Sequence, residues 1–193
     1  MQPKMIVVAG PPGSGKSTAF PVASFDVTFF NADDRAAAVN GGSYTGISKH
    51  IRYQVNREYQ DFVMDCIQRR ESFAIETTLR SDVTFEQARL AKASGFTIEM
   101  RYLALAGFEL HLERVKTRAD AGGHSASEAA LRRIHDASLG NLRRAHEHMD
   151  ELWVYDNSKI GGPPQLVMQA KAGTIMFLQD PPPDWLASAF GWE

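Results

Sequence analysis

Residues 10–17 of the chain read GPPGSGKS, a pattern whose residue types suit the binding of phosphate groups. Its glycines allow the backbone to wrap closely around an anion, so that consecutive N–H groups point inward at phosphate oxygens. Lys16 would reach the β- and γ-phosphates, and the hydroxyl of Ser17 would ligate Mg²⁺. A glycine-rich turn that only caps a helix is the plain alternative. The other loop residues expected at the nucleotide are Gly13, Ser14, Gly15 and Thr18.

The context of this loop favours nucleotide triphosphate binding. It lies between a strand-like run and a helix-like segment, as the G-x-x-x-x-G-K-[ST] pattern requires. Motor ATPases, signalling GTPases and small-molecule kinases all share the pattern. The sequence contains no N-K-x-D, the motif that commonly reads guanine. We therefore expect ATP, with Mg²⁺, as the cofactor.

Carboxylates stand where the second and third predicted strands end. Asp33 and Asp34 follow the strand-like run 25–30, and Glu76 ends the next run. In a parallel sheet, chemistry takes place beyond the carboxyl ends of the strands. Phosphoryl transfer to an alcohol needs a carboxylate that orients the hydroxyl and accepts its proton, and other groups that hold the acceptor. Asp33 suits the first role, and Glu76 with Thr78 suits the second.

Tyr44 and Arg80 complete the expected acceptor side. Tyr44, in the glycine-containing stretch 40–48, could stack on a ring, and Arg80 could reach an acidic acceptor. An ordinary surface loop and a solvent-exposed arginine are the alternatives. The acids have plainer readings as well, because either aspartate could cap the helix that follows. Glu76 could instead organise water in an ATPase or contact the ligands of Mg²⁺.

The glycine pair Gly122-Gly123 separates two helix-like segments that carry arginines. Arginines offset the negative charge of a transferred phosphoryl group, and a closing lid keeps water from competing as acceptor. The range 118–148 is therefore a candidate lid, within which His124 could touch phosphate or substrate. A helical hairpin with solvated arginines is the alternative. We expect a nucleotide contact from Arg114 and catalytic roles for Arg118 and for Arg132 or its neighbour Arg133.

Apolar strand-like runs alternate with helix-like segments, which predicts an α/β fold: a P-loop NTPase-type parallel sheet with helices on both faces, a helical lid and a C-terminal hairpin. The expected strands are 5–10, 25–30, 73–77, 96–105 and 153–158, with a hairpin turning at Ala172-Gly173. The expected helices are a short one from about Gly15, then 47–70, 82–95 and 108–120, one from Ser125 to about His148 with a weak point at Gly140-Asn141, and one in 181–190. Ser125 and Glu128 have the capping-box spacing.

Length and composition indicate one domain over residues 1–193. The formal net charge of −2 gives no general basic field for nucleic acid. The single cysteine, Cys66, excludes an internal disulfide framework and lies on the apolar face of a predicted helix, so we expect a buried thiol. No apolar run approaches the ~20 residues that span a bilayer, and the start does not read as a signal peptide. We expect a cytoplasmic protein without a membrane partner.

The order of these segments resembles the zeta-toxin-like family of P-loop kinases. The resemblance covers about residues 5–158 and rests on GPPGSGKST, NADDR, IETTL, RVKTRADAGGHSASEAALRR, SLGNL and YDNS. Family members are toxins of toxin–antitoxin pairs or stand-alone relatives, and the characterised toxins phosphorylate the 3′-hydroxyl of the amino sugar in UDP-N-acetylglucosamine. The roles that the resemblance implies are phosphate and Mg²⁺ ligation by Lys16 and Ser17, a base at Asp33, acceptor contacts from Glu76 and Thr78, lid arginines at Arg118 and Arg132 or Arg133, and a place on the nucleotide side for Asn157.

The sequence departs from the family on the acceptor side. The toxin pattern has valine-proline after the GGH region, where this chain has SAS, and the region around Tyr44 is short. The resemblance therefore supports a kinase more firmly than it supports one sugar nucleotide. The expected partners are a small-molecule acceptor such as UDP-N-acetylglucosamine and, if the chain is a toxin, a separately encoded antitoxin. A P-loop ATPase or nucleotide-dependent switch, and an inactive relative that acts by protein contact, are the alternatives.

Overall fold

The computed structural model describes residues 2–120 and 126–192. The strands are β1 (Lys4–Ala9), β2 (Thr28–Phe30), β3 (Phe73–Thr77), β4 (Thr97–Ala104), β5 (Glu151–Asp156), β6 (Gln165–Lys171) and β7 (Thr174–Leu178). The helices are α1 (Lys16–Ala19), the 3₁₀ turn η1 (Val22–Phe25), α2 (Ala32–Val39), α3 (Lys49–Arg69), α4 (Val83–Ala93), α5 (Phe108–Asp120), α6 (Glu128–His148) and α7 (Asp184–Phe190). No helix within the described residues is long and apolar enough to cross a membrane.

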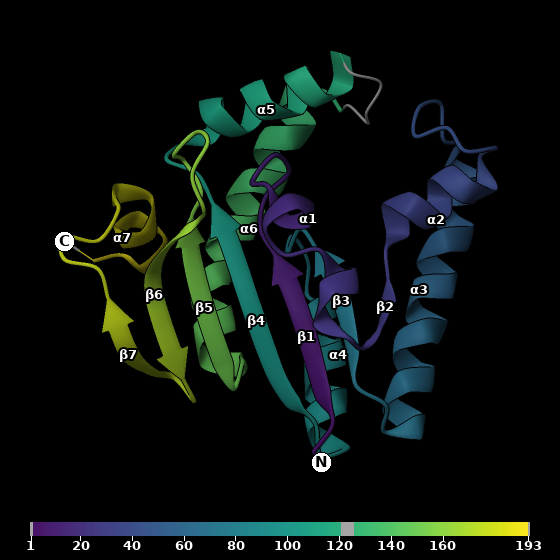
Figure 1. Cartoon of the computed structure of the whole chain (residues 1–193), viewed down its shortest axis with the longest axis horizontal. Coiled ribbons are helices and arrows are strands. Elements are labelled where there is room, and N and C mark those ends of the chain that lie inside the picture. The colour runs from purple at the N-terminus through teal and green to yellow at the C-terminus, as the bar shows by residue number, and fades with distance from the viewer. Residues whose placement is uncertain (1, 121–125, 193) are drawn as a thin grey trace.

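The strands form one seven-stranded sheet in the order β2-β3-β1-β4-β5-β6-β7 (Figure 1). The first five are parallel, and β6 and β7 are added antiparallel as the expected hairpin. The hairpin turns at Ala172 and Gly173, both of which have positive φ. Because β1 has β3 on one side and β4 on the other, the chain that leaves its carboxyl end enters the crevice where ligands bind in such sheets.

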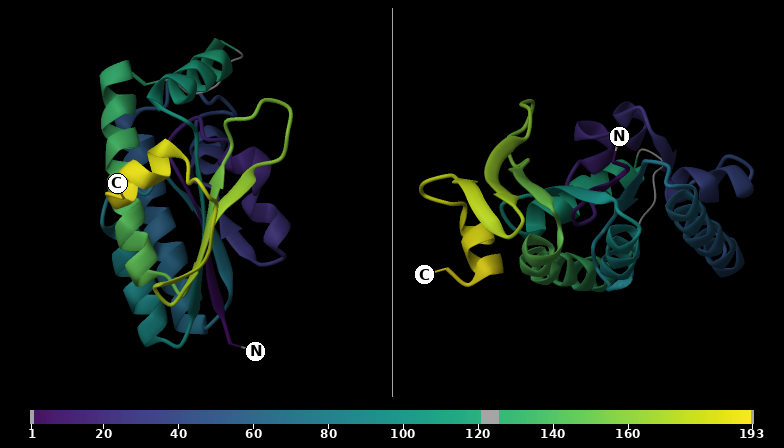
Figure 2. Two further views of the ribbon diagram at one scale, coloured as in Figure 1. Left: turned by 90° about the vertical axis from the view of Figure 1, so that its left-hand side faces the viewer. Right: turned by 90° about the horizontal axis from the view of Figure 1, so that it is seen from below.

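Helices lie on both faces of the sheet, as the sequence predicted, but unequally: α3, α4 and α6 cover one face, whereas the short α1 and η1 cover part of the other (Figure 2). The connections β2 to β3, β3 to β4 and β4 to β5 all advance across the sheet in one direction. Right-handed crossovers that advance in one direction place their helices on one face. Only the connection from β1 to β2 runs the other way, and it contains just the short α1 and η1.

Two clusters of buried side chains reflect this asymmetry. The larger joins the sheet to α3, α4, α6 and α7 and includes Tyr102, which is fully buried. The smaller lies on the other face, where Val22 and neighbouring aromatic rings cover Ile6 and Val8. The β1 strand is therefore enclosed on both sides, as its continuous apolar sequence requires. This burial fixes the loop that follows β1.

The predicted core thiol is confirmed. Cys66 is buried on the face of α3 that packs against the sheet, and it is a free thiol. Burial raises the pKa of this thiol to about 11. At neutral pH the group is therefore protonated, which excludes it as a nucleophile.

Two predictions about α6 are wrong. The helix begins at Glu128 with Ser127 as its N-cap, whose Oγ accepts a hydrogen bond from the backbone N–H of Ala130 at 3.3 Å; the expected cap, Ser125, lies outside the described residues. The helix also runs unbroken through Gly140, where a weak point was expected. Leu142 and Ala145 pack into the main core just beyond that glycine, and this burial outweighs its low helix propensity.

Candidate functional site

The loop between β1 and α1 adopts a conformation that depends on its glycines. Gly13 and Gly15 have φ of +81° and +90°, in the left-handed region that favours glycine. A Cβ at Gly13 would stand 2.5 Å from the backbone oxygen of His111, and one at Gly15 would stand 2.5 Å from Nδ2 of Asn157. The loop is therefore held between α5 and the carboxyl end of β5. Because α1 has only four residues, it would bind a phosphate through its free N–H groups more than through a helix dipole.

Lys16 and Ser17 lie where the sequence places them, at the start of α1. Nζ of Lys16 donates to the backbone oxygens of Gly10 at 2.8 Å and Pro11 at 3.1 Å. Burial lowers the pKa of Lys16; the nearby Arg118 charge lowers it further, while Glu76 and Asp33 oppose the shift. Glu76, Arg118 and Asp33 therefore lie close enough to Lys16 to influence it, and the four residues come from α1, β3, α2 and α5.

Glu76 faces the loop and not open solvent. The hydroxyl of Ser17 donates to Oε2 of Glu76 at 2.9 Å, and Oε1 lies 3.9 Å from Nζ of Lys16. A serine hydroxyl that donates its proton to a carboxylate keeps its oxygen lone pairs for a cation. This geometry favours the reading in which Glu76 supports the metal-ligating serine over the reading in which it holds the acceptor.

Asn157 and Arg114 fasten the loop to neighbouring elements. Nδ2 of Asn157 donates to the backbone oxygen of Ser14 at 2.8 Å, and Nη2 of Arg114 donates to the backbone oxygen of Asn157 at 2.8 Å. Both residues were expected at the nucleotide. The structure places them beside the phosphate loop, joined in a chain that runs from α5 through the end of β5 to Ser14.

We expect Asn157→Ala to weaken ATP binding by about fivefold, because the peptide after Ser14 loses its donor and the loop becomes less ordered. Unfolding free energy should fall by about 1 kcal/mol. Titration calorimetry with ATP and urea denaturation measure the two effects. Ser158→Ala, beside it, is the matched control: its Oγ accepts from the N–H of Ala106 and does not touch the loop. An unchanged ATP affinity in Asn157→Ala would contradict the proposed role of Asn157 in holding the phosphate loop.

His111 connects the phosphate loop to the segment that follows β4. Its Nδ1 lies 3.1 Å from the backbone oxygen of Pro12, and its Nε2 lies 3.1 Å from the backbone N of Leu105. Because the Leu105 N–H must donate to Nε2, the proton of the neutral ring belongs on Nδ1, which donates to Pro12. Burial lowers the pKa of His111 to about 3, and the neighbouring His135 adds to the shift. The sequence predicted a packed histidine here but not its two hydrogen bonds.

The depressed pKa predicts that His111 makes the fold less stable in acid. The unfolded chain takes up a proton at this residue near pH 6.5, whereas the folded chain does so only near pH 3. The stability present above pH 6.5 is therefore lost progressively as pH falls toward 3. Between pH 7 and 5.5, wild type should lose roughly 1 kcal/mol more unfolding free energy than His111→Asn. Urea denaturation at both pH values measures this difference, and identical losses would contradict it.

Asp33 and Asp34 have different surroundings. Asn31 is the N-cap of α2, and its side chain accepts from the backbone N–H groups of both aspartates, so neither aspartate caps the helix. The hydroxyl of Tyr44 donates to Oδ1 of Asp34 at 2.8 Å. Asp33 instead contributes to the electrostatics of Lys16. Asp34 therefore holds Tyr44, while the charge of Asp33, together with that of Glu76, opposes the lowering of the Lys16 pKa.

The segment after β3 has an unusual backbone. Leu79 is fully buried and has φ of +54°. Its neighbours are less buried: Thr78 is half-buried and Arg80 is exposed, so both side chains remain accessible. Oγ1 of Thr77 accepts from the backbone N–H of Leu79 at 3.1 Å.

The arginines flanking the expected hinge have different partners. Arg118 is exposed near the end of α5 and is close enough to Lys16 to affect its pKa. Arg132 donates to Glu109 at 3.2 Å and lies over the ring of Phe108, 4.0 Å from its centre. Its described contacts thus join α6 to the start of α5. Arg133 is exposed.

The hinge itself, Gly122-Gly123 with His124, lies outside the described residues. The second half of the expected lid, 118–148, contributes Leu142 and Ala145 to the main core. A lid over this range stays a prediction, confined by that burial to the part of the range before Leu142.

The residues of the loop fit ATP with Mg²⁺. Oγ of Ser14 is buried and has no hydrogen-bond partner among the described residues. The ammonium of Lys16 is bound to carbonyl oxygens that a phosphate can replace. No group of three or more metal-ligating side chains occurs in the described part of the chain. Mg²⁺ does not require one, since it keeps several waters and binds through substrate phosphates.

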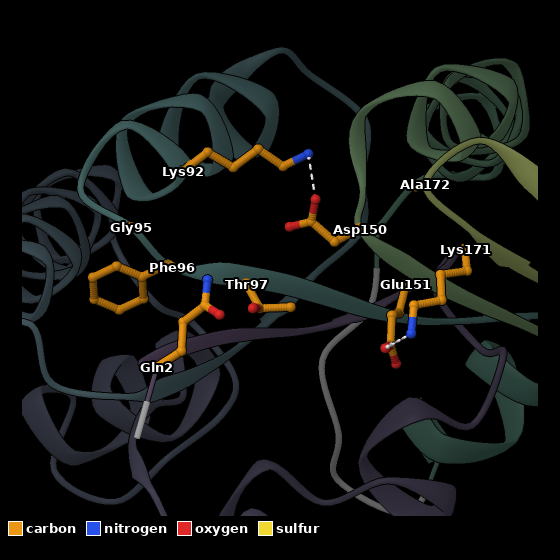
Figure 3. A pocket seen from close by; sticks show the side chains of 9 residues that line it. All are labelled: Gln2, Lys92, Gly95, Phe96, Thr97, Asp150, Glu151, Lys171 and Ala172. Carbon is orange, nitrogen blue, oxygen red and sulfur yellow. Dashed lines mark ion pairs between the residues drawn. The ribbon is translucent and has the colours of Figure 1, made fainter.

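A hollow of about 510 Å³ lies at the opposite end of the sheet, around Phe96 and the starts of β4 and β5 (Figure 3). Its two lysines are each paired with a carboxylate: Lys92 with Asp150 at 2.9 Å, and Lys171 with Glu151 at 3.6 Å. These pairs neutralise the lining. The candidate site is therefore the crevice at the carboxyl ends of the strands.

Comparison with known proteins agrees with this geometry. An uncharacterised protein of Haemophilus influenzae is 28% identical over 140 residues, which cover 66% of this chain and 89% of that protein. The PezAT chromosomal toxin–antitoxin system of Streptococcus pneumoniae superposes with a TM-score of 0.62 at 16% identity, over 100% of this chain and 80% of that one. The AvrRxo1-ORF1:AvrRxo1-ORF2 complex solved with ATP gives 0.67 at 14%, over 90% of this chain and 60% of that one.

These superpositions show a shared fold alone, because their identities are too low to transfer an activity. The chain spans about 60% of the AvrRxo1-ORF1 structure that it matches. A family model, described as an AAA domain, matches residues 5–138, which include the phosphate loop, Asp33, Glu76 and the first half of α6. The match covers more than half of the chain, and the protein belongs to this family, AAA_33.

Proposed function

We propose that the protein is an ATP-dependent kinase that transfers the γ-phosphoryl group to a hydroxyl of a small molecule. The observation that carries the proposal is the set of groups that meet at the phosphate loop: Oε2 of Glu76 accepts from Ser17 at 2.9 Å and its Oε1 lies 3.9 Å from Nζ of Lys16, whose pKa the charges of Arg118 and Asp33 also influence. These residues come from four separate elements of the fold. A loop that binds phosphate, a carboxylate and an exposed arginine in one crevice are the parts that phosphoryl transfer to an alcohol requires.

The proposed roles follow from the contacts. Bound ATP with Mg²⁺ supplies the phosphoryl group and neutralises part of its charge. The loop N–H groups and Lys16 hold the phosphates, and Ser17, oriented by Glu76, faces the cation. Asp33 orients the acceptor hydroxyl and takes its proton. Among the arginines that flank the expected hinge, Arg118 is proposed to offset the charge of the transferred phosphoryl group because its charge influences Lys16. Arg132 would have to leave Glu109 to take part.

For the acceptor, we propose a sugar nucleotide such as UDP-N-acetylglucosamine. The support is the resemblance to zeta toxins, together with the fold shared with PezAT. Thr78, Arg80 and Tyr44 are the proposed acceptor contacts. Of these, Tyr44 is held by Asp34 on the same side of the crevice as Asp33. A separately encoded antitoxin is the proposed protein partner, on the same grounds.

The test is to incubate the protein with ATP and Mg²⁺ and to measure ADP release in the presence of UDP-sugars, nucleosides and free sugars. Strong stimulation by UDP-N-acetylglucosamine, with a phosphorylated product in mass spectrometry, is the expected result. Stimulation by a different acceptor would retain the kinase and reject this acceptor. Hydrolysis that no acceptor stimulates would indicate an ATPase or switch. Tight ATP binding without turnover would indicate an inactive relative.

A further inference from the structure

Leu79 is held in a conformation that its side chain does not favour. A non-glycine residue with φ of +54° is strained, and this conformation persists only where the surroundings fix it. Here both peptide groups of the residue are bound. The N–H of Leu79 donates to Oγ1 of Thr77, and its carbonyl oxygen accepts from Nδ2 of Asn141 at 2.9 Å. Asn141 lies on α6, 62 residues further along the chain.

Asn141 is itself fixed by its neighbours. Nη1 of Arg144, one turn along α6, donates to Oδ1 of Asn141 at 3.0 Å and to Oδ1 of Asp82 at 2.6 Å. The guanidinium of Arg144 also lies over the ring of Phe85, 4.4 Å from its centre. Because Arg144 occupies the amide oxygen, the amide nitrogen of Asn141 must face Leu79. The rotamer of this asparagine is thus set from both ends.

The position of this contact gives it a functional consequence. Leu79 lies three residues after Glu76, whose carboxylate accepts a hydrogen bond from the hydroxyl of Ser17 in the phosphate loop. The residues on either side of Leu79 are Thr78 and Arg80, which stay accessible while Leu79 is fully buried. Because Thr78 and Arg80 flank Leu79 directly, the left-handed turn at Leu79 sets the directions in which their side chains leave the backbone. A hydrogen bond that stabilises the turn also sets their placement.

We propose that Asn141 is a positioning residue for the phosphoryl acceptor: through the carbonyl oxygen of Leu79 it holds Thr78 and Arg80 in the arrangement that binds the acceptor. This rests on the proposed function, in which those two residues contact the acceptor. Asn141 does not touch substrate itself. Its loss should affect the acceptor side of the reaction and leave the ATP side unchanged, since the described contacts of Asn141 do not include the phosphate loop.

The decisive variant is Asn141→Asp, which keeps the shape of the side chain and the oxygen that Arg144 binds but removes the donor to Leu79. With UDP-N-acetylglucosamine as the acceptor probe, we expect the KM for the acceptor to rise about tenfold, as the loss of a buried carbonyl's donor implies. The KM for ATP should stay within about twofold. In hydrogen exchange, peptides covering residues 77–82 should exchange faster, while peptides covering 10–17 should not.

The matched control is Leu142→Ala, the next residue on α6. Leu142 is fully buried in the main core, so this variant loosens the helix without removing the contact to Leu79. It should lower Tm and leave both KM values unchanged. A rise of the acceptor KM in Leu142→Ala as large as in Asn141→Asp, a parallel rise of both KM values, or unchanged exchange in 77–82 would overturn the proposal. If wild type itself shows no stimulation by any acceptor, the proposed function has failed, and the inference fails with it.

Discussion

Lys16→Ala is expected to reduce phosphoryl transfer by at least about 100-fold, in line with the loss of a single preorganised donor to a developing charge. ATP affinity should fall roughly tenfold, since a charge-assisted hydrogen bond to phosphate is lost. The ammonium of Lys16 is buried and bound to the loop carbonyls of Gly10 and Pro11, so the substitution removes a cation from the inside of the loop. Calorimetric titration with ATP and a coupled ADP assay measure the two losses.

The fold should survive this substitution. Burial lowers the pKa of Lys16, so folding does not favour its charged form and the loss of that charge should not weaken the fold. Lys159→Ala is the matched control, because Lys159 lies two residues after Asn157, is exposed and carries the same charge. It should behave as wild type. A Lys16→Ala protein that transfers phosphate at the wild-type rate would remove the loop from the reaction.

Asp33→Asn should lower phosphoryl transfer by about 100-fold or more, the loss expected when a general base is removed. ATP binding should remain nearly intact, because Asp33 affects Lys16 only through space. The helix should also remain, since its cap is the side chain of Asn31, which accepts from the backbone of residue 33 and not from its carboxylate. Single-turnover measurement at saturating ATP and acceptor isolates the chemical step.

Asp34→Asn is the control for this prediction. It removes one negative charge from the same helical turn, so its general electrostatic effect at the crevice is similar. The carboxylate of Asp34 accepts a hydrogen bond from the hydroxyl of Tyr44, and the amide oxygen of an asparagine could still accept that bond. We therefore expect a small change in acceptor KM and little change in rate. Equal losses in the two variants would mean that charge alone, and not proton transfer at Asp33, explains the effect.

The sequence alone was enough to predict the phosphate loop and the parallel sheet around it. Loop, strand and helix signals in residues 5–18 are local, and the structure places Lys16 and Ser17 as the motif predicts. The apolar runs also predicted which segments are strands and which are helices, because the spacing of apolar residues that is typical of each is a local property of the chain. What these patterns could not reveal was that α3, α4 and α6 share one face while only the short α1 and η1 cover the other, because this depends on the direction in which each crossover advances across the sheet.

Tertiary structure decided which polar residues meet. Asp33 and Asp34 are adjacent in sequence and equivalent by composition, and only the hydroxyl of Tyr44 on one of them separates their roles. Ser17 and Glu76 are 59 residues apart in the sequence, yet the hydroxyl of Ser17 lies 2.9 Å from Oε2 of Glu76. The bonds of His111 to Pro12 and of Asn141 to Leu79 span 99 and 62 residues. Sequence patterns report the backbone's local preferences, whereas hydrogen bonds between distant side chains exist only once the core has fixed the elements that carry them.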